Sequence, residues 1–189
     1  MTTIDPTHSG MTFTRRPPRA LLAGTLRKAI ATSDDRAATV ARLAVGLIIL
    51  PHGLQHALGF LGGYGFSGTL GWMTGTLGFP APLAALAIVT ELVAPVLLIA
   101  GVGGRLAAAG IVYIMAGAII THAPAGFFMN WFGKLPAGTE GFEYHLLVTA
   151  LAIVVAIKGS GALSVDRAIF RAIFRAISGD RVGPKVGDQ

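Results

Sequence analysis

The stretch LIILPHGLQHALG, residues 47–59, places two histidines one helical turn apart inside an apolar run long enough to cross a membrane. His52 and His56 share a helix face at the i, i+4 spacing. Pro51 removes an amide donor and crowds the carbonyl of Leu47, which predicts a kink and a polar backbone group in need of a partner. Kinked backbone is tolerated at membrane depth only against protein or water. We therefore expect both histidine rings to be buried inside a helical bundle.

The composition places the chain among integral membrane proteins. Of its 189 residues, 53% are hydrophobic and 13% are charged, which is far more apolar than a soluble domain of that length. Four apolar segments approach or reach the roughly 20 residues that a helix needs to span hydrocarbon. They cover residues 40–58, 82–100, 106–122 and 144–157. The predicted fold class is therefore all-α, an integral membrane four-helix bundle.

The basic residues predict the orientation of this bundle. They lie before the first segment, between the second and third, and after the fourth. Arg42 and Arg105 belong to this pattern and are interpreted mainly as topology signals. Because lysine and arginine in short flanking loops stay on the cytoplasmic side, we expect a multi-pass membrane protein with both termini in the cytoplasm. The connections 59–81 and 123–141 are then aromatic-rich outer loops.

Three regions follow from these segments. Residues 1–37 form a basic, partly disordered cytoplasmic arm, in which Ser33 or Asp34 caps the first helix. Residues 38–158 form the transmembrane domain. Residues 159–189 form a cytoplasmic amphipathic helix and a flexible tail, since the repeat AIFRAIFRAI puts arginines on one stripe. Such a helix is interfacial, so the expected partner of the basic residues is membrane lipid, with no nucleic acid.

The chain has no cysteine. Thiolate nucleophiles, thiol relays and iron–sulfur ligation are therefore excluded within it. Any redox chemistry needs a bound cofactor or a partner protein.

Glu91 is the strongest single candidate for a functional residue. It lies about ten residues into the second segment, near mid-bilayer, where an ionised carboxylate costs about 2.5–3.5 kcal/mol. Pro95 follows four residues later and frees the backbone carbonyl of Glu91. One position thus offers a side chain and an unpaired backbone oxygen, although a structural hydrogen bond between helices would explain the same residue.

Polar side chains of all four segments gather between mid-membrane and the outer surface. The predicted catalytic residues are Glu91, His52 and His56, and the predicted cofactor-binding residues are His52, His56, Gln55, Glu91, Tyr113, His122 and Glu143. A quinone headgroup fits such a cluster, because it needs proton-exchanging groups beside an apolar pocket. We predict no metal, with a site formed by His52, His56 and Glu91 as the alternative.

Several motifs together are similar to those of the DoxX family of small four-helix membrane proteins. They are Arg42 with Gly46 and PHGLQH, TELVAPVLLIAGVGGRLAA around Glu91 and Arg105, THAPAGFF at His122, and GFEYHLL followed by GSGALSVDR at the fourth segment. The resemblance covers roughly residues 38–167. The family usually carries a lysine after its HG element, where this chain has Gln55 and His56.

The resemblance implies a membrane oxidoreductase subunit. Some relatives are the quinone-linked subunit of thiosulfate:quinone oxidoreductase, and others associate with partners in thiol or oxidative-stress defence. The implied partner is a soluble or membrane redox protein such as a sulfurtransferase, a dehydrogenase or a superoxide dismutase, and a homo-oligomer is compatible with the sequence. The alternative is a non-catalytic membrane scaffold or a small-solute carrier.

Overall fold

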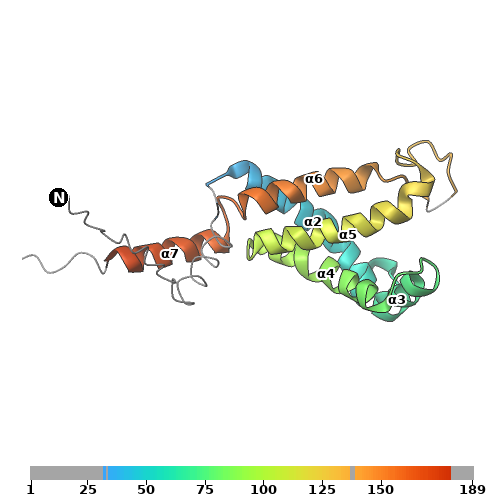
Figure 1. The fold of residues 1–189 in the computed structure, drawn as a ribbon, viewed down its shortest axis with the longest axis horizontal. Coiled ribbons are helices and arrows are strands. Elements are labelled where there is room, and N and C mark those ends of the chain that lie inside the picture. The colour runs from blue at the N-terminus through green and yellow to red at the C-terminus, as the bar shows by residue number, and fades with distance from the viewer. Residues whose placement is uncertain (1–31, 33, 137–138, 180–189) are drawn as a thin grey trace, which may run out of the picture.

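The computed structural model describes residues 32, 34–136 and 139–179, and over these residues it is all-helical (Figure 1). The first described helix, α2 (Arg36–Leu58), begins at Asp35, whose carboxylate accepts hydrogen bonds from the amides of Ala37 and Ala38. The prediction of Ser33 or Asp34 as this cap was wrong by one or two residues. The predicted disorder of the arm and the flexible end of the tail fall on residues outside the described ranges.

Four helices lie side by side as a bundle. After α2 come the short turn η1 (Phe60–Gly62), α3 (Gly65–Gly75), α4 (Ala81–Ala100), α5 (Gly104–His122), η2 (Ala123–Ala125), α6 (Glu143–Lys158) and α7 (Val165–Gly179). Within the bundle, α2 packs against α4 and α6, and α5 packs against the same two helices. Helix α3 covers α2 and α4, so the first predicted outer loop contains a packed helix.

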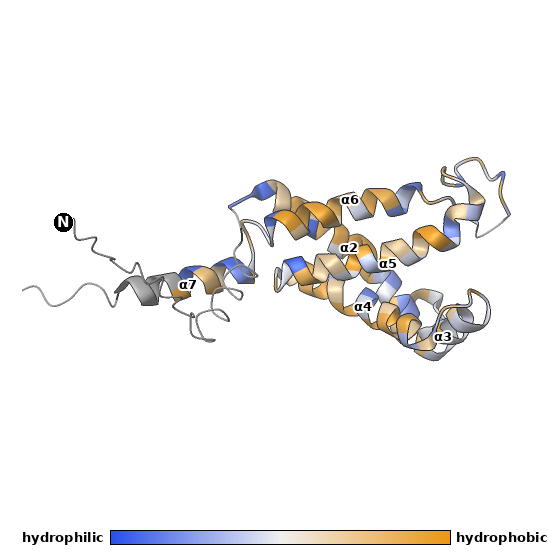
Figure 2. Cartoon of the chain, viewed as in Figure 1, coloured by the Kyte–Doolittle hydropathy of each residue, from blue (hydrophilic) through white to orange (hydrophobic). Residues whose placement is uncertain are grey.

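Within the described part of the chain, three helices are long and apolar enough to cross a membrane, namely α2, α4 and α5 together with η2 (Figure 2). Helix α6 belongs to the bundle, but its 16 residues extend only about 24 Å at the α-helical rise. The hydrocarbon core is about 30 Å thick. The structure therefore confirms an all-helical fold with three candidate membrane-spanning helices.

Large apolar side chains cover the outside of the bundle. Leu47 of α2 is 60% exposed, Leu106 of α5 is 79% exposed and Ile120 is 69% exposed. A water-soluble protein rarely exposes so continuous an apolar surface. This surface is what a helix surrounded by lipid presents.

The core between the helices is built from fully buried aliphatic side chains. Val45 and Ile49 come from α2, Leu98 from α4, Ile111 from α5 and Val155 from α6, and none is more than 1% exposed. All four bundle helices thus contribute to one apolar centre, and polar groups are left to its two ends.

Glycines let α2 and α4 approach closely. A Cβ atom on Gly53 would lie 2.3 Å from the backbone oxygen of Glu91, and one on Gly46 would lie 3.1 Å from that of Pro95. Small residues are a common solution for helix contacts inside membranes, where close backbone packing supplies the attraction. Both helices run unbroken through their internal prolines, Pro51 and Pro95.

Arg42 also has a structural role, beside the topology signal that the sequence predicts. The residue is only 1% exposed. Its guanidinium donates to the carbonyls of Ile99 at 2.7 Å, Ser160 at 2.9 Å and Leu163 at 2.6 Å, and also to that of Leu98. The carbonyls that end a helix have no helical partner, so a buried donor stabilises them. Arg42 thereby joins α2 to the end of α4 and to the α6–α7 connection.

Arg105 has a similar role one helix further along. Its guanidinium donates to the carbonyls of Ala156 and Ile157, each at 2.7 Å. These two carbonyls lie in the last turn of α6, where the helical ladder ends. The charge of Arg105 is therefore used in packing α5 against α6.

Helix α7 is fixed to the bundle at its first turn. The buried carboxylate of Asp166 accepts hydrogen bonds from the amides of Gly103 and Gly104 at 2.9 and 3.2 Å and from the hydroxyl of Ser160 at 2.6 Å. From this anchor α7 runs away from the bundle along its long axis (Figure 1). A helix at the membrane surface would lie roughly perpendicular to the spanning helices, and α7 does not (Figure 1). Its interfacial placement therefore stays a prediction.

Candidate functional site

A cavity of about 510 Å³ lies at the end of the bundle opposite Arg42. Residues from α2, α3, α4, α5 and α6 and from the connection before α4 line it. Most of these side chains are apolar or aromatic, including Ile49, Trp72, Met73, Phe79 and Met115. A volume of this size is typical of pockets for small organic ligands.

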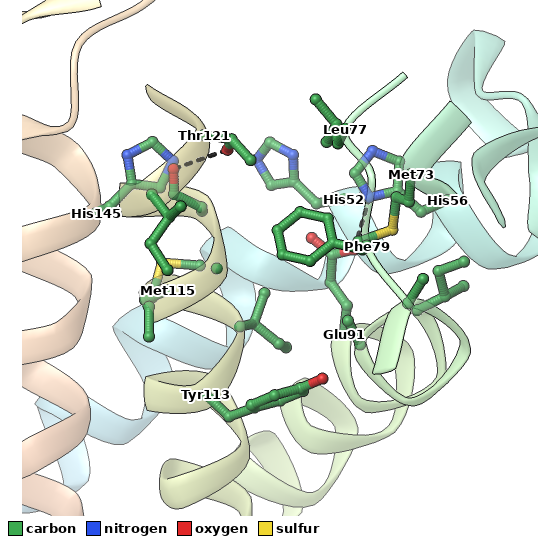
Figure 3. Close-up of a pocket in the computed structure, with 18 of the residues that line it drawn as sticks. His52, His56, Met73, Leu77, Phe79, Glu91, Tyr113, Met115, Thr121 and His145 are labelled. Atoms are coloured by element: carbon green, nitrogen blue, oxygen red, sulfur yellow. Dashed lines mark hydrogen bonds and ion pairs between the residues drawn. The ribbon is translucent and has the colours of Figure 1, made fainter. Parts of the chain in front are cut away.

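His56 and Glu91 meet on the wall of this cavity. The Nδ1 atom of His56 lies 2.6 Å from Oε2 of Glu91, which joins α2 to α4 (Figure 3). The side chain of Glu91 is 13% exposed and that of His56 is 36% exposed. A hydrogen bond to the imidazole offsets the cost of holding a carboxylate at membrane depth. The structure thus gives Glu91 the partner that the sequence required.

His52 and Gln55 have separate surroundings. The ring of His52 lines the cavity, and its centroid is 6.5 Å from that of His56. His52 is exposed, so the expectation that both histidines are buried was wrong: they border an open cavity and not a packed core. Gln55 lies outside the cavity lining, where its amide donates to the carbonyl of Leu61 at 3.2 Å.

Two predicted residues of α5 line the cavity from the other side. The hydroxyl of Tyr113 donates to the backbone carbonyl of Leu83 on α4 at 2.9 Å. Nδ1 of His122 lies 2.8 Å from the carbonyl of Ala118, and its ring centroid lies 4.5 Å from that of His145 with the two rings tilted by 39°. Each of these side chains therefore already has a protein partner.

Glu143 lies outside the cavity lining. Its carboxylate accepts a hydrogen bond from the amide of Met129 at 3.3 Å and so ties the second long connection to the start of α6. Of the predicted site residues, the structure brings five to one cavity and leaves two outside it. The five are His52, His56, Glu91, Tyr113 and His122, and the two are Gln55 and Glu143.

The family comparison covers the part of the chain that carries this pair. The DoxX family model matches residues 37–124. Residues 37–124 form a DoxX domain. No curated protein and no solved structure matches the chain. The DoxX domain takes in almost all of α2 and the whole of α3, α4 and α5, and thus both members of the His56–Glu91 pair.

Among the polar side chains that line the cavity, four were absent from the predicted site, namely Thr69, Thr121, Tyr144 and His145. Thr69 comes from α3 inside the DoxX domain, whereas Tyr144 and His145 come from α6 beyond the matched segment. His145 is 9% exposed and Thr69 is 2% exposed. Glu143 and His145 point to different sides of a helix that turns about 100° per residue. No pattern in the sequence favours His145 over Glu143, because only packing decides which side of the helix faces the cavity.

Metal binding finds no support in the geometry. Within residues 32, 34–136 and 139–179, no three histidine, aspartate or glutamate side chains are grouped so that they could hold a metal ion. The arrangement of His52, His56 and Glu91 therefore does not support the alternative of a shared metal site.

Proposed function

We propose that this DoxX membrane protein is the quinone-binding subunit of an oxidoreductase, and that its cavity holds the quinone headgroup. The observation that carries the proposal is the His56–Glu91 hydrogen bond on the wall of an otherwise mainly apolar cavity. Apolar walls with a few converging polar groups are the usual form of a site for a small organic ligand.

The cavity offers what a quinone headgroup needs. Its volume of about 510 Å³ admits a substituted ring. Trp72 and Phe79 supply aromatic surface, and His52 and His56 supply ring nitrogens that donate or accept hydrogen bonds. The buried hydroxyls of Tyr144 and Thr69 have no partner among the described residues, which leaves hydrogen-bonding capacity for a ligand.

The bound quinone would supply the redox chemistry, taking up two electrons and two protons. The electrons come from a partner, such as a sulfurtransferase, a dehydrogenase or a superoxide dismutase complex, because this chain has no cysteine. His56 and Glu91 share a hydrogen bond on the cavity wall and would donate a proton to the headgroup bound beside them. His52, one turn away, binds and orients the ring.

The proposal includes a membrane orientation. The hydrogen bonds of Arg42 and Arg105 and the charged start of α7 lie at one end of the bundle, and we assign this end to the cytoplasm of a bacterial cell. The cavity then lies in the outer half of the bilayer. The connection after η2 carries exposed aromatics, which suit the headgroup level. Helix α6 completes the fourth span with the residues before it.

Quinone retention tests this function. The full chain is purified in mild detergent with native lipid, and bound quinone is extracted and quantified per protein. We expect the wild type to retain quinone, and Glu91→Gln and His52→Ala to lose most of it. Glu143→Gln is the matched control, since this carboxylate lies outside the cavity and should leave retention unchanged.

A different pattern would favour another class of protein. Equal quinone content in wild type, Glu91→Gln and His52→Ala would count against quinone binding in the cavity. If Glu91→Gln instead abolished recovery of a partner protein or uptake of a solute, while redox phenotype stayed intact, a membrane scaffold or a small-solute carrier would be the better description.

A further inference from the structure

Tyr144 presents a hydroxyl that the protein does not use. The hydroxyl oxygen is buried and has no hydrogen-bond partner among the described residues, although the residue lines the cavity. The Glu91 side chain, which is hydrogen-bonded to His56, lines the same cavity. A buried polar group without a partner is costly, so such groups usually bind something. Both residues therefore border one cavity whose volume is that of a small-molecule site.

Thr69 repeats this arrangement from a different helix. It is 2% exposed, its hydroxyl oxygen is buried without a partner, and it lines the same cavity from α3. Several other threonines in the described helices, namely Thr74, Thr121 and Thr149, donate their hydroxyl to a carbonyl of their own helix. Thr149, for example, donates to the carbonyl of His145 at 2.7 Å. The hydroxyl of Thr69 differs from these because it has no acceptor among the described residues, and Thr69 lines the cavity.

Tyr113 shows the contrast within the same cavity. Its hydroxyl is already committed to the carbonyl of Leu83 at 2.9 Å. The two tyrosines therefore line one cavity with different hydrogen-bonding states, one satisfied by the protein and one available.

We propose that the hydroxyls of Tyr144 and Thr69 are ligand-binding groups that form a second polar side of the cavity, in addition to the His56–Glu91 pair. This inference rests on the proposed function and specifies its substrate class. The hydroxyls donate from α6 and α3, whereas the pair reaches in from α2 and α4. The ligand is then a ring that carries hydrogen-bond-accepting oxygens on more than one edge, as a 1,4-quinone does, and not a ring with a single polar end.

Fluorescence of Trp72 offers a binding assay inside the cavity. The chain has two tryptophans. Trp72 lines the cavity, and Trp131 is 74% exposed in the second long connection. In a Trp131→Phe background, quenching of Trp72 by decyl-1,4-benzoquinone in detergent reports binding next to the site. Saturable quenching is expected for this reference protein.

The test compares variants that remove single hydroxyls. We expect Tyr144→Phe and Thr69→Val each to lower the affinity for the quinone roughly three- to tenfold, which is the usual effect of one lost hydrogen bond. Without ligand, both variants should unfold at the same or a higher temperature, because each loses an unsatisfied buried group. Thr149→Val and Thr74→Val are the matched controls, because both threonines lie outside the cavity lining and donate to the carbonyls of His145 and Leu70. They lose satisfied hydroxyls, so they should bind quinone as the reference does and unfold at a lower temperature.

The outcomes separate this inference from the proposed function. Saturable quenching in the reference protein with unchanged affinity in Tyr144→Phe and Thr69→Val would overturn the inference and leave quinone binding standing. It would mean that only water satisfies these hydroxyls. A reference protein without saturable quenching would overturn both. Weaker binding in the two variants, with normal binding in the two controls, would establish the second polar side.

Discussion

The backbone carbonyl of Glu91 faces Gly53 across the contact between α2 and α4. Pro95 has no amide hydrogen to donate to this carbonyl, so it lacks its usual helical partner. A Cβ atom on Gly53 would lie 2.3 Å from the carbonyl oxygen and 2.7 Å from the Cα of Leu92. The close approach of the glycine covers the free carbonyl and also sets how near His56 comes to the side chain of Glu91.

Replacing Gly53 with alanine should therefore destabilise the bundle. Because the obstructing atoms are backbone and cannot rotate away, we expect Gly53→Ala to cost about 1–3 kcal/mol of unfolding free energy. Thermal unfolding followed by tryptophan fluorescence in detergent measures the effect. Gly71→Ala on α3, where an added Cβ meets nothing within 4 Å, is the control and should be neutral or slightly stabilising. Equal unfolding temperatures for the two variants would refute this account of the contact.

Arg42 should not tolerate replacement by lysine. Its guanidinium donates to carbonyls at the end of α4 and in the α6–α7 connection, and a lysine ammonium cannot match this planar geometry. We expect Arg42→Lys to lose at least about 2 kcal/mol of stability, because hydrogen bonds to a buried charge are broken. Arg171→Lys, at an exposed position of α7, should change the unfolding temperature little. An Arg42→Lys protein as stable as Arg171→Lys would show that charge alone matters.

A double-mutant cycle should detect coupling between His56 and Glu91. We expect His56→Asn and Glu91→Gln to interact by about 1–3 kcal/mol, since they share a hydrogen bond that involves a charged group. The stability of the two single variants and the double variant gives this coupling energy. The same cycle with His52→Asn serves as the comparison and should be additive within about 0.5 kcal/mol. Coupling energies of equal size in both cycles would mean that the coupling does not come from the His56–Glu91 hydrogen bond.

Acid should weaken the contacts that hold the start of α2 to the end of α6 and to α7. The Lys158 ammonium lowers the pKa of Asp35, and the Arg167 guanidinium lowers the pKa of Asp34, each mainly by a hydrogen bond. A lowered folded-state pKa contributes stability above the ordinary value of 3.8, and this contribution disappears as the pH falls through the folded-state values.

The pH dependence can be isolated with a conservative variant. Asparagine still caps a helix, so Asp34→Asn/Asp35→Asn removes the charges and keeps the cap. We expect the variant to unfold at a lower temperature than the wild type at pH 7, and the two unfolding temperatures to converge as the pH falls below 3.8. A gap of constant size down to pH 3 would mean that these ion pairs add no stability.

The fold could be predicted largely from the sequence. The apolar segments predicted at 40–58, 82–100 and 106–122 correspond to α2, α4 and α5 within a few residues. The length of an apolar segment, its composition and the glycines and prolines that end it are local properties of the sequence. A membrane-spanning helix also makes its backbone hydrogen bonds within itself. The prediction was weaker at α6, whose apolar run is short, and in the first long connection, where glycines concealed α3.

The candidate site could be predicted in part. The helical spacing of His52 and His56, and the cost of placing Glu91 inside a membrane, marked residues that the structure does bring to one cavity. The sequence could not show that Gln55 bonds to a nearby loop carbonyl and Glu143 to a distant one, or that Tyr144 has the available hydroxyl and Tyr113 does not. Each of these facts depends on which atom of another segment lies within hydrogen-bonding distance.

The sequence by itself determined that this is a helical membrane protein and that its polar residues must find partners. Both follow from the transfer of residues from water to hydrocarbon, which depends on composition and helical period alone. Only the tertiary structure decided which partners they find: Glu91 with His56, Arg42 with the helix ends, and Tyr144 with none among the residues that the structure describes. Hydrogen bonds act over about 3 Å, so their pairing is fixed by the packing of helices that are far apart in the chain.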